Sequence, residues 1–125
     1  MSNLIIFEGM NIDVLTKDDV NFEFDGSVLF YGSQTASVLG YKDGNDAIKV
    51  HVEEEFKHLI TKDKLKGEIP FSLGQRGNWF ITDDGVIDLT YKSKLPSASV
   101  FRKKVREIIK KIQLTGRFDE VENKI

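Results

Sequence analysis

The segment between Pro96 and Gly116 most constrains the fold, because it predicts one long amphipathic helix. Proline suits the first turn of a helix, where its missing N–H would have no partner, and glycine commonly ends a helix. At 100° per residue, the apolar side chains fall within an arc of about 100°, the width of a core-facing stripe. They are Phe101, Val105, Ile108, Ile109 and Ile112. We therefore expect this helix to pack on the rest of the chain.

The other side of this helix is basic. It carries Arg102, Lys103, Lys104, Arg106, Lys110 and Lys111. Residues 92–117 hold nine basic residues and one acid, Glu107, a net charge of +8. The remaining 99 residues carry nine basic and nineteen acidic groups, a net charge of −10, so the total of −2 hides a polarised chain. Such asymmetry informs on binding partners rather than on fold.

Several runs rich in β-branched and aromatic residues predict strands. The runs cover residues 3–7, 10–16, 21–24, 27–31 and 78–82. Asp25-Gly26 predicts a two-residue hairpin turn, since both turn positions need positive φ. The charge-mixed residues 53–70 are expected to form a surface excursion.

Capping residues predict shorter helices in the middle of the chain. Ser33 suits the N-cap of a first helix and Gly40 its left-handed C-cap. Asp43 or Asn45 suits the cap of a second helix that runs to Val52. Thr82 or Asp83 begins a third helix, through Val86, Ile87, Leu89 and Tyr91. Two short helices joined at a glycine resemble a helix-turn-helix in outline only.

Together these elements predict an α+β fold: a small N-terminal antiparallel sheet with hairpins, short helices and a long basic C-terminal helix. A chain of 125 residues suits one domain, which we assign to residues 1–118, with 119–125 as a frayed tail. No apolar run approaches the roughly 18 residues of a membrane span, and no signal peptide is expected. The absence of cysteine excludes disulfides and thiolate chemistry and is compatible with the cytoplasm.

Candidate catalytic and metal-binding residues have simpler interpretations. His51 and His58 are seven residues apart, whereas a helical zinc motif needs a spacing of four and a third ligand. Gly74 and Gly77 lack the Lys-Ser/Thr of a phosphate loop and indicate a β-turn. Paired acids such as Asp83-Asp84 have no nucleophile or base beside them. We expect no catalytic activity, metal or cofactor.

The basic side of the last helix has three interpretations. It contacts nucleic acid, it contacts an acidic protein, or it is merely solvated. A bias of nine basic residues to one acid exceeds what solubility requires, because mixed charges serve solubility better. A clustered basic face is also the first criterion for a nucleic-acid-binding protein.

The order of the motifs resembles the BRO-N domain, which is named for baculoviral repeated genes and is widespread at the N-terminus of phage antirepressors. The pieces are Val38-Leu39-Gly40-Tyr41, Ala47-Ile48 with His51-Val52, Phe80–Val86, Ser93–Ala98 with Phe101, and Thr115–Phe118. The resemblance covers roughly residues 3–118. Lys104-Val105 stands where family members usually carry Trp-Val, and Ile109-Lys110 where they carry Leu-Pro.

The resemblance implies a DNA-binding antirepressor or transcriptional regulator of a phage or prophage, acting in the cytoplasm of a bacterial cell. The chain is then a stand-alone module or the N-terminal part of a longer regulator. We expect phosphate contacts from a set that we name the basic ridge: Lys92, Lys94, Arg102, Lys103, Arg106, Lys110 and Lys111. We expect base contacts from Gln34, Lys42, Asn45 and Lys49, although Asn45 has an equal claim as a helix cap.

Two further expectations concern partners. A regulator that reads two half-sites on double-stranded DNA is expected to be a homodimer. Its subunit contact is expected at Phe56, Leu59, Ile60 and Phe71. The alternative function is a protein-binding antagonist, whose basic face meets acidic patches of a repressor or a host protein without DNA contact.

Overall fold

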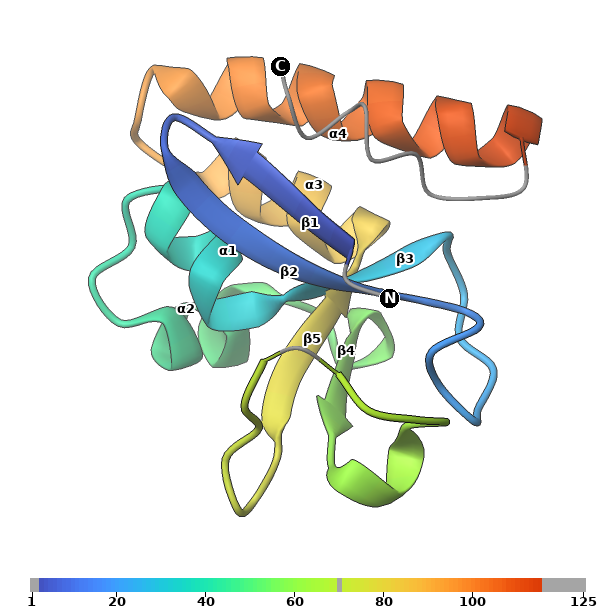
Figure 1. Ribbon diagram of the computed structural model, residues 1–125. Coiled ribbons are helices and arrows are strands. Elements are labelled where there is room, and N and C mark those ends of the chain that lie inside the picture. Colours follow the sequence, from blue (N-terminus) through green and yellow to red (C-terminus); the bar gives the residue numbers. More distant parts are fainter. Residues whose placement is uncertain (1–2, 70, 116–125) are drawn as a thin grey trace.

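The computed structural model describes residues 3–69 and 71–115, and this part of the chain contains a five-stranded antiparallel sheet. The strands follow the spatial order β1-β2-β3-β5-β4 (Figure 1). Their bounds are β1 Asn3–Phe7, β2 Met10–Thr16, β3 Val28–Tyr31, β4 Lys57–Ile60 and β5 Asn78–Thr82. The predicted α+β class is confirmed.

Four α-helices accompany the sheet in the described residues. They are α1 Gly32–Val38, α2 Gly44–His51, α3 Asp83–Lys92 and α4 Ser97–Thr115, and the short 3-10 helices η1 Glu54–Phe56 and η2 Lys62–Lys64 lie between α2 and β5. Helix α4 crosses the top of the molecule in Figure 1, beside α3 and the β1–β2 pair. None of the described helices is long and apolar enough to cross a membrane. The predicted helix end at Gly116, the basic residue Arg117 and the tail 119–125 lie outside the described residues.

Apolar side chains cover both faces of the sheet. On one face, Ile5, Phe7 and Phe30 pack with side chains from all four helices, among them Phe101 and Val105. On the other face, Leu29, Ile60 and Phe80 pack under the loops that flank the strands. Those loops contribute Val20, Phe22, Phe24, Leu65, Ile69, Phe71 and Leu73. The sheet is therefore a central layer between helices and loops.

The first hairpin confirms the predicted strands 3–7 and 10–16. Phe7 pairs with Met10, so Glu8 and Gly9 form the turn between β1 and β2. Their φ angles are 50° and 77°. Positive φ at both positions is what a two-residue type I′ turn requires, and it fits the twist of the strands.

The hairpin predicted at Asp25-Gly26 is wrong. Residues 21–24 form no strand, and β3 pairs instead with β2 and β5. Gly26 does adopt a φ of 119°, but for a different reason. A side chain there would collide with the carboxylate of Asp83, which accepts a 3.1 Å hydrogen bond from the backbone N–H of Ser27. The glycine permits this close approach to the start of α3.

The helix caps agree with the sequence at most positions. Gly40 has a φ of 84° and follows α1 in a Schellman arrangement, with the Tyr41 N–H donating to the Ala36 carbonyl at 3.0 Å. Asp43, rather than Asn45, caps α2, and Thr82 caps α3. The N-cap predicted at Ser33 is wrong, because the N-cap of α1 is Tyr31, two residues earlier, and it makes no side-chain hydrogen bond.

The surface excursion predicted for residues 53–70 is wrong in part, since it contains β4. Lys57 is only 9% exposed, although it lies in a sequence that looks solvated. Its ammonium group lies 3.2 Å from Glu54 and contacts the ring face of Trp79 at 5.7 Å from the centroid. These partners lower the cost of burying the charge. Glu54 is close in sequence, but the contact with Trp79 is not visible in the local sequence.

The residues predicted for the subunit contact are used within the monomer. Ile60 is 0% exposed, and Phe56 and Phe71 pack against the two core clusters. Leu59 is half-buried. Phe56, Ile60 and Phe71 thus contribute to the packing of the chain itself, and a subunit contact at this apolar set stays a prediction.

Acidification is expected to destabilise the protein through His58. Its Nε2 atom is buried without a hydrogen-bond partner in the described residues, and its ring lies 5.4 Å from that of Phe22. Burial, and then the charge of Lys64, lower the pKa of His58 from its usual value of 6.5. At pH values near and below 6.5, His58 therefore binds a proton more readily in the unfolded chain than in the folded protein. The free energy of unfolding should therefore fall as the pH drops through 6.5 towards the folded-state pKa.

Urea unfolding at several pH values measures this effect. The variant His58→Phe, which preserves an aromatic ring among Phe22 and Phe24, should show a smaller loss of stability in the same pH window. An equal loss in both proteins would show that other groups cause the pH dependence.

Candidate nucleic-acid interface

The orientation of α4 follows from its apolar stripe. Phe101, Val105 and Ile108 are at most 1% exposed and join the core with Ile109 and Ile112 beside them. The ring of Phe101 meets that of Phe7 edge to face, with centroids 5.0 Å apart. The predicted stripe is therefore confirmed, and it turns the opposite side of the helix to solvent.

Most of the basic ridge lies on that outer side. Lys103, Arg106 and Lys110 are exposed, whereas Arg102 is half-buried. Lys111 is half-buried and has an interaction within the molecule. The exposed residues of the ridge on α4 thus lie in its second, third and fourth turns.

Lys104 does not belong to the outer side, which corrects the helical-wheel prediction. It is only 8% exposed and has an interaction within the molecule. A rotation of 100° per residue places position 104 about 40° from position 108, at the edge of the apolar stripe. Its long methylene chain can cover apolar surface there.

Tyr91, a residue that sequence reasoning did not select, lies between two arginines of the ridge. The guanidinium carbon of Arg102 is 3.7 Å from the centroid of the Tyr91 ring, and Arg102 Nε donates to Thr90 Oγ1 at 2.7 Å. Arg106 Nη2 donates to the Tyr91 hydroxyl at 3.1 Å. This hydrogen bond, followed by the charge of Arg106, lowers the pKa of Tyr91 from its usual value of 10.0.

Lys92 and Lys94 extend the basic ridge beyond α4, and hydrogen bonds hold the segment that carries them in place. Lys92 lies at the end of α3 and donates to the carbonyl of His51 at 2.9 Å, whereas Lys94 is exposed in the α3–α4 loop. Between them, Ser93 Oγ donates to the Leu39 carbonyl at 2.7 Å. The ridge therefore extends across α4 and the end of α3, on a fixed support.

Gln34, a predicted base-contact residue, is occupied inside the molecule. Its Oε1 accepts from the backbone N–H of Asp13 at 2.6 Å, and its Nε2 donates to the Asp13 carboxylate at 2.9 Å. Both ends of the amide thus fasten α1 to β2. We therefore leave Gln34 out of the proposed interface.

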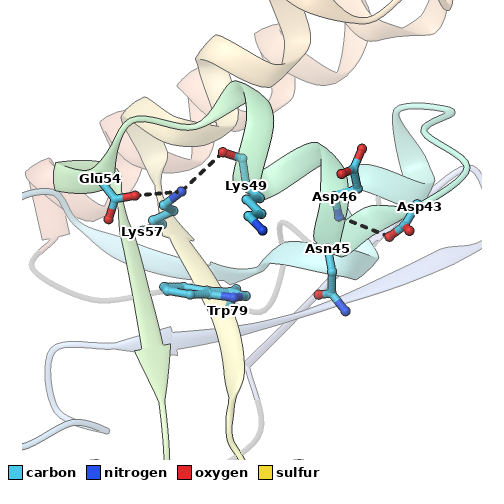
Figure 2. Close-up of a pocket in the computed structure, with 7 residues that line it drawn as sticks. All are labelled: Asp43, Asn45, Asp46, Lys49, Glu54, Lys57 and Trp79. Atoms are coloured by element: carbon cyan, nitrogen blue, oxygen red, sulfur yellow. Dashed lines mark hydrogen bonds and ion pairs between the residues drawn. The ribbon is translucent and has the colours of Figure 1, made fainter.

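Asn45 and Lys49 lie in an open pocket of about 580 Å³ between α2 and the β4–β5 edge of the sheet. Figure 2 shows the Trp79 indole as its floor, with Asn45 and Lys49 descending from α2 towards it. Lys57 and Glu54 form one wall, while Asp43 and Asp46 lie at the other end. Lys42 is exposed in the α1–α2 connection, outside this pocket.

The charges of this pocket differ from those of the ridge. Lys57 is paired with Glu54, which leaves Lys49 facing the two aspartates as the other lysine of the lining. The hydrogen bond from Lys92 to the carbonyl of His51 connects the basic ridge with the end of α2. Asn45 and Lys49 therefore lie in an electrostatic setting that differs from that of the basic ridge.

Metal-binding and phosphate-loop geometry is missing from the described residues. No group of three or more His, Asp or Glu side chains there could hold a metal ion. Gly77 donates its N–H to the Gly74 carbonyl at 2.9 Å, and its φ is 83°, so this glycine pair forms the predicted β-turn.

Comparison with protein families identifies the fold that carries this surface. Residues 19–111 match the model of the BRO family, N-terminal domain. The chain belongs to this family. The match includes the whole of α1, α2 and α3 and most of α4, but β1 and β2 lie entirely outside its bounds.

Three curated viral relatives of this BRO domain agree with the assignment. An uncharacterized Bro-N domain-containing protein of Autographa californica nuclear polyhedrosis virus is 33% identical over 107 residues, which cover 78% of this chain and 33% of that protein. A putative Bro-N domain-containing protein of Invertebrate iridescent virus 6 is 34% identical over 91 residues, covering 64% and 22%. An uncharacterized Bro-N domain-containing protein of Acanthamoeba polyphaga mimivirus is 30% identical over 109 residues, covering 82% and 42%.

This BRO domain spans less than half the length of those curated relatives. No solved structure matches the chain. Lys104 is only 8% exposed, so its position lies at the edge of the core in this BRO domain.

Proposed function

We propose that this BRO domain binds the phosphate backbone of double-stranded DNA through the basic ridge. The observation that carries the proposal is the fixed presentation of Lys103, Arg106 and Lys110 on the solvent side of α4, whose other side is buried in the core. Lysine and arginine that neutralise phosphates release condensed counterions, which provides affinity without sequence information.

Base contacts, where the domain makes them, come from Lys42, Asn45 and Lys49 near α2. All three side chains are exposed, and amide or ammonium groups can bind base edges in the major groove. The biological role that we propose is that of an antirepressor or transcriptional regulator inside an infected host cell. The cell is bacterial if the protein follows the phage antirepressors that it resembles, and a homodimer would read two half-sites.

Binding of labelled duplex DNA at several salt concentrations tests this function. With seven phosphate contacts, one for each residue of the basic ridge, the logarithm of the association constant should fall against the logarithm of salt concentration with a slope of about −6. The variant with alanine at Lys103, Arg106 and Lys110 should have a slope smaller by up to about 3, one unit for each lost contact.

A matched triple variant controls for net charge. Lys62, Lys66 and Arg76 are exposed, and residues 61–69 and 71–77 lie at the end of the molecule away from α4 (Figure 1). Alanine at these three positions should leave the slope unchanged. An absence of DNA binding by the wild type at about 50 mM salt, where phosphate contacts are strongest, would contradict the proposal and favour an acidic repressor protein as the partner.

A further inference from the structure

Tyr91 is an aromatic residue placed among cations on a solvated surface. It is 61% exposed and belongs to α3, whereas the two arginines that contact it belong to α4. Arg102 covers one face of the ring, and Arg106 reaches the hydroxyl at its edge. One tyrosine therefore holds two guanidinium groups from consecutive turns of another helix.

Both guanidinium groups keep free donors in this arrangement. A guanidinium group has five N–H donors. Arg102 uses its Nε–H for Thr90, which leaves its terminal nitrogens for a ligand, and Arg106 uses one N–H of Nη2 for Tyr91. These two hydrogen bonds restrict the rotation of both arginine side chains, so less conformational entropy is lost when the side chains bind a ligand.

The described residues supply this pair of arginines with no anion. Among residues 3–69 and 71–115, neither Arg102 nor Arg106 forms an ion pair with a carboxylate. Holding two like charges at one tyrosine costs Coulomb energy, and a bound oxyanion would relieve that cost. Phosphate oxygens suit this geometry because arginine presents planar, paired N–H donors to them.

We propose that Arg102 and Arg106, positioned by Tyr91 and Thr90, form a preorganised site for the phosphodiester groups of the nucleic-acid backbone. The inference rests on the proposed function and deepens it. It separates two geometrically fixed phosphate contacts from the lysines, which act as mobile point charges. Tyr91 is a positioning residue in this site.

Charge-preserving substitutions separate this site from bulk electrostatics. Arg102→Lys and Arg106→Lys retain the positive charge but lose the fork of donors, so each should weaken duplex binding about tenfold at constant salt with an unchanged salt slope. Arg76→Lys makes the same change on an exposed side chain far from α4 and should bind as the wild type does. Wild-type affinity in both Arg102→Lys and Arg106→Lys would overturn the site and leave DNA binding by the ridge intact.

The role of Tyr91 has its own readout. Tyr91→Phe keeps the ring for Arg102 but removes the acceptor for Arg106, so binding should weaken about threefold, and Tyr91→Leu should weaken it about tenfold. Raising the pH from about 7 to about 9 brings Tyr91 closer to ionisation, because its pKa is lowered from 10.0. The added negative charge should reduce wild-type affinity more than that of Tyr91→Phe. Equal affinities and equal pH profiles of wild type and Tyr91→Phe would overturn the positioning role.

A measurement without DNA keeps the two proposals separable. Titration with dimethyl phosphate, followed by NMR of the arginine Nε–Hε groups, should shift the signals of Arg102 and Arg106 but not that of Arg76. If the wild type fails to bind duplex DNA at about 50 mM salt, the proposed function fails, and these shifts alone then decide the site. Unchanged signals would overturn it.

Discussion

Glutamate at Lys103, Arg106 and Lys110 together is expected to reduce DNA affinity about 10³-fold, because three attractions become repulsions. A pair of unit charges about 4 Å apart in water contributes about 1 kcal/mol, so each reversal costs up to about 2 kcal/mol. Screening brings the total to about 4 kcal/mol, and each 1.4 kcal/mol corresponds to a factor of about ten. Fluorescence anisotropy of a labelled duplex measures the loss.

The matched variant places glutamate at Lys62, Lys66 and Arg76, so both proteins undergo the same change in net charge. If location on α4 matters, the second variant should retain affinity within a factor of about ten, because only long-range repulsion changes. Equal losses in the two variants would show that net charge alone governs binding, and that the basic ridge has no special role. All six side chains are exposed, so we expect both variants to fold.

Alanine at Phe101 is expected to lower the free energy of unfolding by about 3–5 kcal/mol. The side chain is 0% exposed and contacts Phe7, so its removal leaves a cavity between the sheet and α4. A loss of this size is a large share of the roughly 5–15 kcal/mol typical of a small domain. Because α4 carries the ridge, DNA binding should also weaken as the folded fraction falls.

Urea unfolding followed by tryptophan fluorescence measures this loss, since Trp79 is the single tryptophan of the chain and packs against the same core. Val100→Ala is the control, because Val100 is adjacent on α4 but 60% exposed. We expect it to change stability by less than about 0.5 kcal/mol. A loss below about 1 kcal/mol for Phe101→Ala would contradict the assigned packing of α4.

Local signals in the sequence predicted much of the fold. Strands 3–7, 10–16 and 78–82 were readable because their residue types and turns act within a few positions, and Asp43 and Thr82 were readable as caps for the same reason. Strand β4 was missed because Lys57 is buried beside Trp79, which is distant in sequence. The hairpin at Asp25-Gly26 was predicted wrongly because Gly26 packs closely against Asp83. That residue lies more than fifty positions further along the chain.

The candidate site shows the same division between local and long-range information. The wheel of α4 placed Lys103, Arg106 and Lys110 on the outside, since helical rotation is a local property. Tyr91 was not predicted as a site residue, because its contact with Arg102 depends on a neighbouring helix that brings the guanidinium group onto the ring. The internal hydrogen bonds of Gln34 were not predicted for a similar reason, as its partner Asp13 belongs to a strand.

The contact between Phe7 and Phe101 makes the N-terminal hairpin part of the support for the last helix. The family match begins at residue 19, after β1 and β2 have ended. A fragment cut at that match would leave β3 without its neighbour β2 and would uncover Phe101 under α4. The unit that folds is therefore longer than the stretch that the family model matches. An expressed fragment of this chain should begin before β1, so that Phe7 can pack against Phe101.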